Sequence, residues 1–247
     1  MDGQGTTLSE RGMRLRPQLA ALVLKVLKRS LPQPVRPALR RAIEETEALA
    51  RHLEGTAQAR PLATMERLRL NLGSGPKPRP GWVNVDLQPD ADLALDIRRP
   101  LPFPDASCDE IYAEHVLEHL AYPGEVEEVL ADWFRVLARG GSISLGVPDT
   151  ADVLQAYASG DGRYFDWCRA QPWNPSWIET RLDQINFHFR QQSPNFGEAH
   201  LYAYDFETLA ARLAAAGFVD VASRPFDPAL DSEDRRMYTL YVRAVKA

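Results

Sequence analysis

Hydrophobic and polar residues alternate in short runs along residues 67–247. Leu68, Leu70 and Leu72 are separated by polar residues, a pattern that predicts a strand. Short apolar runs predict further strands at 82–86, 109–114, 142–147, 217–221 and 238–245, with a short strand or extended loop at 91–97. Amphipathic segments between them predict helices at 125–138 and 205–216, the second with Asp205 as its N-cap. Strands that alternate with helices predict an α/β fold with a mainly parallel sheet.

The first 60 residues have a different pattern. Residues 1–12 carry no periodic signal, and Met13 to Leu31 predicts a helix with one apolar face and many basic residues around it. Prolines then interrupt the chain, and a second helix is predicted from Arg36 to Glu54, followed by a linker up to Thr64. We therefore predict an N-terminal helical extension at 1–60 and one larger domain at 61–247.

The extension is basic, and two interpretations of it stay open. Nine basic residues and no acidic one lie between Arg11 and Arg41. Residues 13–41 fit a basic amphipathic element that contacts an anionic membrane surface or a partner. The interpretation that we favour is a helical pair packed on the larger domain or on a second copy of the chain, which would make a homo-oligomer.

Composition and charge narrow the classes of protein. The chain has 247 residues, 45% of them hydrophobic, and only two cysteines, which predicts a cytoplasmic protein without disulfides or a cysteine metal cluster. We find neither a bilayer-spanning apolar run nor the order of a secretory signal, although peripheral contact with the inner membrane stays open. Residues 61–247 hold 18 basic and 28 acidic residues, a charge that argues against bulk nucleic acid as substrate.

A glycine loop follows the first strand of the domain. Gly73-Ser74-Gly75 has the small residues that let a ligand lie against the backbone. A dinucleotide fingerprint would have a third glycine where Pro78 stands, then a full helix, and an acidic residue about 20 positions on. The prolines at 76, 78 and 80 disfavour that helix, and Asp86 comes early, so we disfavour a redox dehydrogenase. Asp86 suits a ribose.

Five ordered motifs now carry a resemblance. They are Leu-Asn-Leu-Gly-Ser-Gly at 70–75, Gly-Trp-Val-Asn-Val-Asp at 81–86, Pro-Phe-Pro-Asp-Ala-Ser-Cys-Asp-Glu-Ile at 102–111, His-Val-Leu-Glu-His-Leu at 115–120 and Arg-Val-Leu-Ala-Arg-Gly-Gly at 135–141. In this order the chain resembles the class I S-adenosylmethionine-dependent methyltransferases, most closely a compact bacterial, type-11-like branch with a shortened first helix. The resemblance implies a Rossmann-like, doubly wound, mostly parallel seven-stranded sheet whose last strand is antiparallel.

The same resemblance implies a cofactor, S-adenosyl-L-methionine, and the residues around it. The loop would hold the methionyl end, Asp86 the ribose, and Asp96 with the Ile97 backbone the adenine amino group. A capping or turn role for Asp96 stays open. The implied cofactor-binding set is Asn71, Gly73, Ser74, Gly75, Asp86, Leu87, Asp96, Ile97, Glu114 and His115.

Candidate catalytic residues follow the fourth predicted strand. We predict a helix that starts there, and the spacings of three and four between His115, Glu118 and His119 place all three on one side of it. A histidine whose pKa is near neutral can take a proton from a hydroxyl acceptor, and His115 and His119 are candidates. The resemblance adds His200, because a histidine just before the helix at 205–216 recurs in similar proteins. For His119, a single structural hydrogen bond is the alternative.

A metal ion is an alternative at these positions. A Glu-x-x-Glu-His pattern holds a divalent ion in some O-methyltransferases, including certain quinone and RNA ribose enzymes. Here His115 stands at the first glutamate position, which argues against an oxygen-preferring ion such as magnesium. We predict no metal ligands, and leave open a softer ion at His115, Glu118 and His119.

Residues 150–200 exceed a minimal sheet and are rich in aromatic and polar side chains. We predict that they form a lid over the acceptor, a small-molecule or glycan compound; a small satellite core is the alternative. The resemblance favours O-methylation of a sugar or envelope-glycan hydroxyl by direct methyl transfer. A methyltransferase for small molecules of the quinone or phenol type, and a non-catalytic module that only binds the cofactor, stay open.

Overall fold

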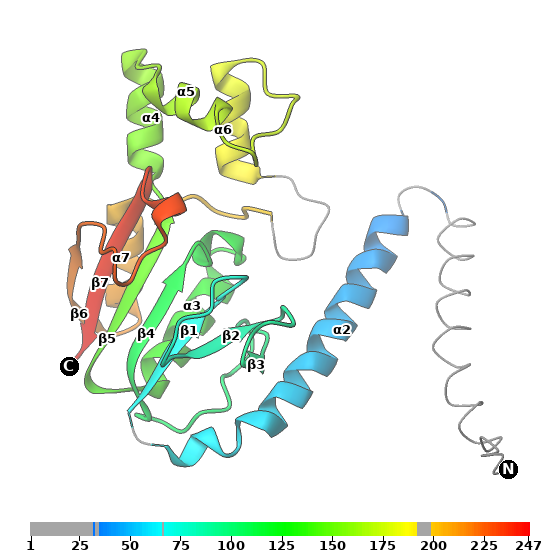
Figure 1. The fold of residues 1–247 in the computed structure, drawn as a ribbon, viewed down its shortest axis with the longest axis vertical. Helices are drawn as coiled ribbons and strands as arrows, with labels where there is room; N and C mark the ends of the chain where they lie inside the picture. The colour runs from blue at the N-terminus through cyan, green and yellow to red at the C-terminus, as the bar shows by residue number, and fades with distance from the viewer. Residues whose placement is uncertain (1–31, 33–34, 66, 192–198) are drawn as a thin grey trace, which may run out of the picture. The chain divides into compact units, whose positions relative to one another are not determined.

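The computed structural model describes residues 32, 35–65, 67–191 and 199–247 (Figure 1). Its contacts divide the chain into two units, Met1–Glu47 and Ala48–Ala247. The predicted helix from Met13 to Leu31 lies outside the described residues. The second predicted helix is confirmed as α2, Val35–Ala59, which ends beyond the predicted Glu54.

Seven strands form one sheet in the order β3-β2-β1-β4-β5-β7-β6. The strands are β1 (Leu68–Leu72), β2 (Val83–Asp86), β3 (Leu93–Ala94), β4 (Cys108–Glu114), β5 (Leu137–Pro148), β6 (Phe218–Ser223) and β7 (Thr239–Lys246). Strands β1 to β5 pair in parallel, and β7 runs antiparallel between β5 and β6. The predicted seven-stranded, mostly parallel sheet is confirmed. The order reverses between β1 and β4, and open sheets of this kind bind ligands beyond the carboxyl ends of the strands at such a point.

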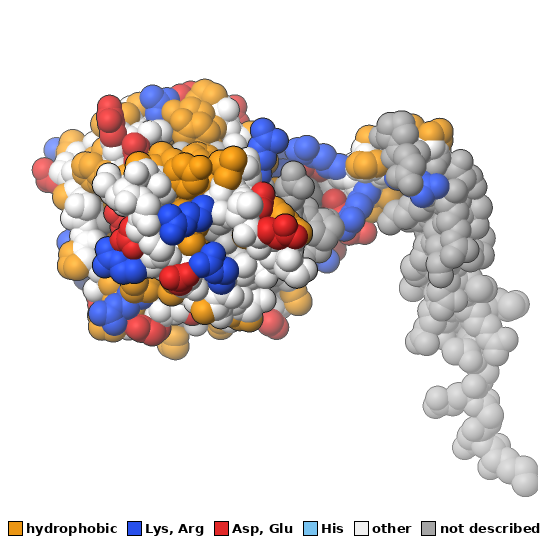
Figure 2. All heavy atoms as spheres, turned by 90° about the horizontal axis from the view of Figure 1, so that it is seen from above, with side chains coloured by type: hydrophobic (Ala, Val, Ile, Leu, Met, Phe, Trp, Pro, Cys, Tyr) orange, Lys and Arg blue, Asp and Glu red, His pale blue; other side chains and the backbone are white. Residues whose placement is uncertain are grey.

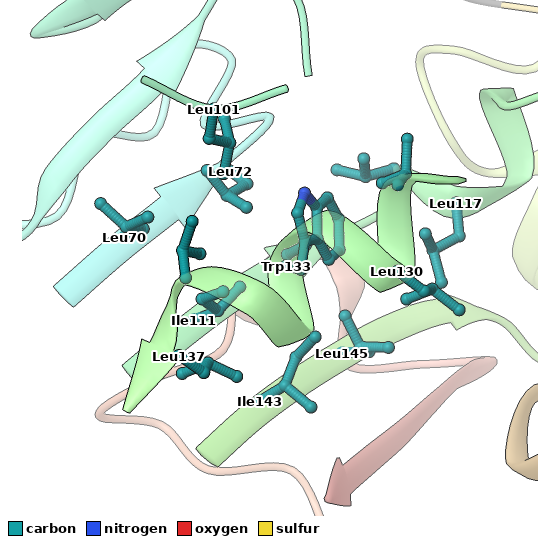
Figure 3. Packing of buried hydrophobic residues seen from close by; sticks show 14 of the residues in the cluster. Leu70, Leu72, Leu101, Ile111, Leu117, Leu130, Trp133, Leu137, Ile143 and Leu145 are labelled. Carbon is teal, nitrogen blue, oxygen red and sulfur yellow. The ribbon is translucent and has the colours of Figure 1, made fainter. Parts of the chain in front are cut away.

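The core lies between the sheet and the helices of its crossovers. Figure 3 shows Leu70, Leu72, Ile111 and Leu145 of the sheet gathered around Trp133 of α3 (Gly124–Val136). All five side chains are buried. Helix α7 (Phe206–Ala215) contributes to the same core, and the Asp205 side chain caps it by accepting from the Thr208 backbone, as predicted. This core fixes the ends of β1 and β4, and therefore the loops that follow them.

Two local predictions are wrong. A helix does not start at His115: its φ is 57°, and only a 3-10 turn, η2 (Leu117–His119), follows before α3. The His115 backbone N–H donates to Gly146 O in β5, which keeps this residue in the sheet pairing. Helix α3 ends at Val136, not at 138, and β5 already begins at Leu137, which pairs with Cys108. The short link between β1 and β2, which contains the three prolines, has no helix, as predicted.

Three helices follow β5: α4 (Thr150–Ser159), α5 (Arg163–Arg169) and α6 (Arg181–Arg190). They lie beyond one end of the sheet (Figure 1). Their buried side chains form a second small core that includes Val153, Phe165, Cys168 and Ile185, so the predicted satellite core is present. The view onto this end shows hydrophobic side chains beside basic ones (Figure 2).

The second half of α2 packs within the larger unit. Its buried residues are Ala48, His52, Gly55 and Ala59, whose spacing places them on one face. A Cβ at Gly55 would lie 2.3 Å from the Ala94 carbonyl oxygen, so only glycine lets the helix backbone approach β3 this closely. Among the described residues, no helix has both the length and the apolar character needed to span a membrane.

The remaining elements are short. Two further 3-10 turns are η1 (Leu62–Thr64) and η3 (Glu233–Arg235). Both cysteines, Cys108 and Cys168, are buried and free. Burial raises the pKa of each thiol to about 11, so neither is a thiolate at neutral pH.

Candidate active site

Backbone hydrogen bonds hold the glycine loop against β2. The N–H groups of Gly73 and Ser74 both donate to Val85 O, at 2.8 and 3.1 Å, which joins the loop to β2. Gly73 has a φ of +68°, and a Cβ there would lie 2.4 Å from Val116 Cγ2. Gly75 has a φ of +50° with open space where a Cβ would project. The loop therefore needs glycine at both positions, and it is free on the side of Gly75.

Asp86 closes the loop from the end of β2. Its carboxylate accepts from the Gly75 backbone N–H and from the Gln88 backbone N–H, both at 2.8 Å. The residue is only partly buried, so its carboxylate remains accessible beside these two bonds. Asn71 is buried behind the loop and donates to Asn84 Oδ1 at 2.9 Å. In the structure Asn71 therefore supports the loop, and its contact with a cofactor stays a prediction.

The loop fits the cofactor that the resemblance implies. Ser74 is buried, and its Oγ has no hydrogen-bond partner in the described part of the chain. Buried hydroxyls are normally hydrogen-bonded, so the Ser74 hydroxyl can take a partner from a bound ligand. Together with the open side of Gly75 and the carboxylate of Asp86, it offers the polar groups that a methionyl end and a ribose require.

The residues predicted to surround the adenine lie near β3. Asp96 is buried, and both of its carboxylate oxygens accept from the Arg98 side chain. Burial alone would raise the pKa of Asp96, but the Arg98 hydrogen bonds and charge outweigh it and lower this pKa. Ile97 packs partly against the core, and Leu87 O accepts from Arg51 at 2.7 Å. An adenine contact at Asp96 would share the carboxylate with Arg98.

Glu114, at the end of β4, faces the C-terminal part of the chain. Its carboxylate accepts from the Ser232 backbone and hydroxyl and from the Tyr241 hydroxyl. Its backbone oxygen accepts from Arg235 at 2.7 Å. The sequence does not indicate these partners, because they lie more than 100 residues away and follow no motif. These hydrogen bonds do not test whether Glu114 contacts the cofactor, so that contact stays a prediction.

His115 comes next and turns the chain away from the sheet. Its Nε2 lies 3.0 Å from Thr239 Oγ1 and its Nδ1 lies 3.4 Å from Glu118 Oε1. Its positive φ costs about 1–3 kcal/mol, a strain that occurs mostly at functional sites. Burial, together with the positive charge of Arg235, lowers the pKa of His115 well below 6.5, so the imidazole is neutral near pH 7.

Glu118 is the buried centre of the group. It is 1% exposed, and neither carboxylate oxygen has a hydrogen-bond partner among the described residues. In the described chain, two side chains with a basic nitrogen lie within 4.0 Å of this carboxylate. His115 Nδ1 is 3.4 Å and His119 Nε2 is 3.8 Å from Glu118 Oε1. Its backbone oxygen accepts from the N–H groups of Leu201 and Tyr202, which brings the segment before α7 to this place.

The rings of His119 and His200 pack edge-to-face next to Glu118, with ring centroids 5.1 Å apart. His119 Nδ1 lies 3.2 Å from Ala199 O, and His200 Nδ1 lies 2.8 Å from His188 O. A carbonyl oxygen can only accept, so both rings donate Nδ1–H to these carbonyls. Burial lowers the pKa of His200, so this ring too is neutral near pH 7.

The structure therefore brings together all three predicted catalytic histidines and Glu118. Asp149, directly after β5, caps α4 by accepting from the backbone N–H groups of Ala151 and Asp152. The group follows β4, the strand beside β1, so it and the glycine loop lie at neighbouring strand ends. A ligand loop beside neutral imidazoles can bind a group donor and take a proton from an acceptor.

Part of the chain matches a known protein family. Residues 83–145 match the family model described as a methyltransferase domain. No curated protein sequence matches the chain.

Solved structures give distant similarities. A SAM-dependent methyltransferase from Methanosarcina mazei is 17% identical with a TM-score of 0.48, over 73% of this chain and 92% of that one. One from Archaeoglobus fulgidus is 18% identical with a TM-score of 0.43, over 77% and 92%. The CurJ carbon methyltransferase is 16% identical with a TM-score of 0.42 over 74% of this chain, which spans 50% of that protein's length. At these values the similarities say nothing of the acceptor.

Proposed function

We propose that this chain, which is a class I S-adenosylmethionine-dependent methyltransferase, methylates a hydroxyl oxygen of a sugar or envelope-glycan acceptor. The observation that carries the hydroxyl assignment is the group of neutral imidazoles beside the glycine loop. His115 and His200 both have a pKa lowered by burial, and a neutral imidazole can accept the proton that a hydroxyl must lose. An acceptor without an acidic proton would not need such a group.

The residues of the loop bind and orient the cofactor. The backbone of Gly73 to Gly75 and the Ser74 hydroxyl would hold the methionyl end, and Asp86 the ribose hydroxyls. When bound, S-adenosylmethionine supplies a methyl group already activated on its sulfonium. The bond from sulfur to methyl carbon breaks, the bond from carbon to acceptor oxygen forms, and S-adenosylhomocysteine, the methyl ether and one proton are produced. The protein contributes mainly alignment and proximity of the two reactants.

His115 is the first candidate for the group that takes the proton. It directly follows β4, the strand that pairs with β1, which leads into the glycine loop. The Thr239 hydroxyl, 3.0 Å from Nε2, orients the ring. The buried Glu118 carboxylate at 3.4 Å from Nδ1 would stabilise the imidazolium that forms.

The helices after β5 support a sugar as acceptor. Trp177, Asn186, Phe187 and Arg190 line a hollow on α6 and the segment before it. Trp173 and Trp177 are about half exposed, at 48% and 54%. Aromatic faces pack on the C–H groups of a sugar ring, while amide and guanidinium groups hydrogen-bond its hydroxyls. Helix α6 also carries His188, whose carbonyl oxygen holds His200, so the hollow and the imidazole group share one helix.

A planar acceptor of the phenol or quinone type is the second candidate. The same aromatic side chains would stack on a flat ring, and Trp173 already stacks on Phe187 with an interplanar angle of 12°. A module that binds the cofactor without turnover would retain the loop and form no product.

The test is an acceptor screen with the full-length chain, S-adenosylmethionine and two panels, one of glycans and one of phenols and quinols. Release of S-adenosylhomocysteine and the methylated product are followed by mass spectrometry. We expect product from the glycan panel. Product from the phenol panel alone would support the second candidate, and cofactor binding without any product would support the binding module.

Cofactor binding is tested separately by calorimetry with Asp86→Asn. Loss of a charged hydrogen-bond acceptor is expected to weaken S-adenosylmethionine binding about 10- to 100-fold. Asp90→Asn is the matched control, because Asp90 is exposed and four residues away. Equal affinity of the two variants would remove Asp86 from the cofactor site.

A further inference from the structure

We propose that Glu118, His119 and His200 bind a divalent transition-metal cation, against the expectation from the sequence that the chain has no metal ligands. Each residue offers one ligand atom, and these atoms lie within 4.8 Å of one another. One ion can contact three atoms so spaced if each side chain moves by a fraction of an ångström toward its metal–ligand distance of about 2.0–2.2 Å. The set differs from the alternative that the sequence left open, because His200 replaces His115.

The Glu118 carboxylate is the first independent observation that points to a ligand. It is 1% exposed, and both oxygens lack a hydrogen-bond partner among the described residues. Buried carboxylates are normally paired, hydrogen-bonded or bound to a metal. No arginine or lysine of the described chain lies within ion-pair distance of it, and its neighbours His115 and His119 are imidazoles. A cation between the carboxylate and the two rings would supply the missing partner.

The orientation of the two rings is the second observation. His119 and His200 each donate Nδ1–H to a backbone carbonyl oxygen, of Ala199 and of His188. Histidines that bind a metal generally donate their other ring N–H in this way, which fixes the tautomer and the direction of the free lone pair. His119 Nε2 lies 3.8 Å from Glu118 Oε1, so that lone pair and the carboxylate flank a common space.

The ligands are already assembled by the fold. Glu118 and His119 lie in η2, and His200 lies between α6 and α7, in a distant part of the sequence. The N–H groups of Leu201 and Tyr202 donate to Glu118 O at 2.6 and 3.2 Å, which ties the two segments together next to all three side chains. A cation would therefore bind without ordering a new segment of chain.

The donor set indicates the kind of cation. Two imidazole nitrogens and one carboxylate oxygen suit Zn²⁺, Co²⁺, Fe²⁺ or Mn²⁺, whereas Mg²⁺ prefers oxygen ligands alone. Three protein ligands leave coordination positions open, as in catalytic rather than structural sites. On the basis of the proposed function, Glu118, His119 and His200 would hold the cation, and an open position would take the acceptor hydroxyl oxygen, whose acidity a cation increases.

The test measures binding of Co²⁺ and Zn²⁺ to the chelator-treated, full-length chain, without cofactor or acceptor. We expect one ion per chain by calorimetry, and a visible absorption band of coordinated Co²⁺. Loss of a residue that hydrogen-bonds to a metal ligand typically lowers metal affinity about 10- to 100-fold. Glu118→Gln and His200→Ala remove the ligands themselves, so we expect them to weaken binding by more than this. Glu128→Gln is the matched control, because Glu128 is exposed on α3.

Thermal unfolding with and without the ion gives a second measurement. Zn²⁺ is expected to raise the melting temperature of the parent chain and of Glu128→Gln, and to leave that of Glu118→Gln unchanged. Circular dichroism confirms that each variant is folded; if Glu118→Gln does not fold, His200→Ala decides.

Three results would overturn the proposal. They are no binding of Co²⁺ or Zn²⁺, equal binding by the parent chain and both ligand variants, and a preference for Mg²⁺ over these ions. Methyl transfer by a chain that binds no metal would reject this inference and leave the proposed function intact. Metal binding by a chain that methylates no hydroxyl acceptor would support this inference and reject the proposed function.

Discussion

The glycine loop and the group around Glu118 lie at neighbouring strand ends but differ in how their polar groups are satisfied. In the loop, the N–H groups of Gly73, Ser74 and Gly75 all donate to partners in β2. Around Glu118, the buried carboxylate has no hydrogen bond within the described chain. The loop thus keeps its shape by itself and presents a surface to a ligand. The second group leaves a buried carboxylate without a hydrogen-bond partner in the described chain, so it can take a partner from outside.

The largest expected effect concerns the group around Glu118. His115→Ala should lower kcat about 10²- to 10⁴-fold, the usual contribution of a general base, while the Kd for S-adenosylmethionine changes much less. Steady-state kinetics and calorimetry on the same preparation measure both. The reverse split, a weakened Kd with unchanged kcat, would move His115 from the chemical step to cofactor binding.

The next effect tests whether the loop keeps its shape by itself. Gly73→Ala combines a positive φ with an overlap on Val116, and should destabilise the fold by about 2–4 kcal/mol in urea unfolding. Gly75→Ala is the matched control: its φ is also positive but the space is open, so about 1 kcal/mol is expected. Equal losses in the two variants would show that Val116 yields and that the loop is less rigid than described.

Ser74 is the exception within the loop and predicts a smaller effect. Because its buried Oγ has no partner in the described chain, Ser74→Ala should leave the free energy of unfolding unchanged to within about 0.5 kcal/mol. The same change should weaken S-adenosylmethionine binding about 3- to 10-fold, the value of one neutral hydrogen bond. A variant that loses stability and keeps its affinity would mean that the hydroxyl has a structural partner.

The smallest effect is a pH dependence at Asp96. Its pKa in the folded chain lies below the ordinary 3.8, because the Arg98 hydrogen bonds outweigh burial. The stabilisation is therefore fully present above pH 3.8 and is lost as the pH falls through the lower, folded pKa. Urea unfolding from neutral pH downward should show a stability difference between the parent chain and Asp96→Asn that shrinks in acid. A difference that grows in acid would contradict the direction of this pKa.

Local patterns were sufficient to predict the sheet and the loop. Alternating leucines in β1 and apolar runs in β4 and β5 are short-range signals, and the glycines of the loop reflect backbone angles that few other residues adopt. The prediction of a helix at His115 was wrong, because spacing alone cannot show that the His115 N–H donates to Gly146 O in β5. A tertiary hydrogen bond overrode the local pattern there.

The membership of the site could be predicted only in part. The spacing of His115, Glu118 and His119 indicated a group, and the resemblance added His200. The sequence could not show that Glu118 would be left without a hydrogen bond, or that the carbonyls of Ala199 and His188 would direct the two rings. These facts depend on how segments far apart in the sequence meet, and no local period encodes that.

One contact in α2 bears on how copies of the chain meet. At Gly55 the helix backbone lies against the Ala94 carbonyl of β3, the strand at one margin of the sheet. An uncovered marginal strand offers unpaired N–H and C=O groups to any other strand and invites aggregation. Here a helix occupies that margin, and the absence of a side chain at one position lets it lie close enough to do so. Growth of the sheet from one molecule into the next is thereby blocked at β3.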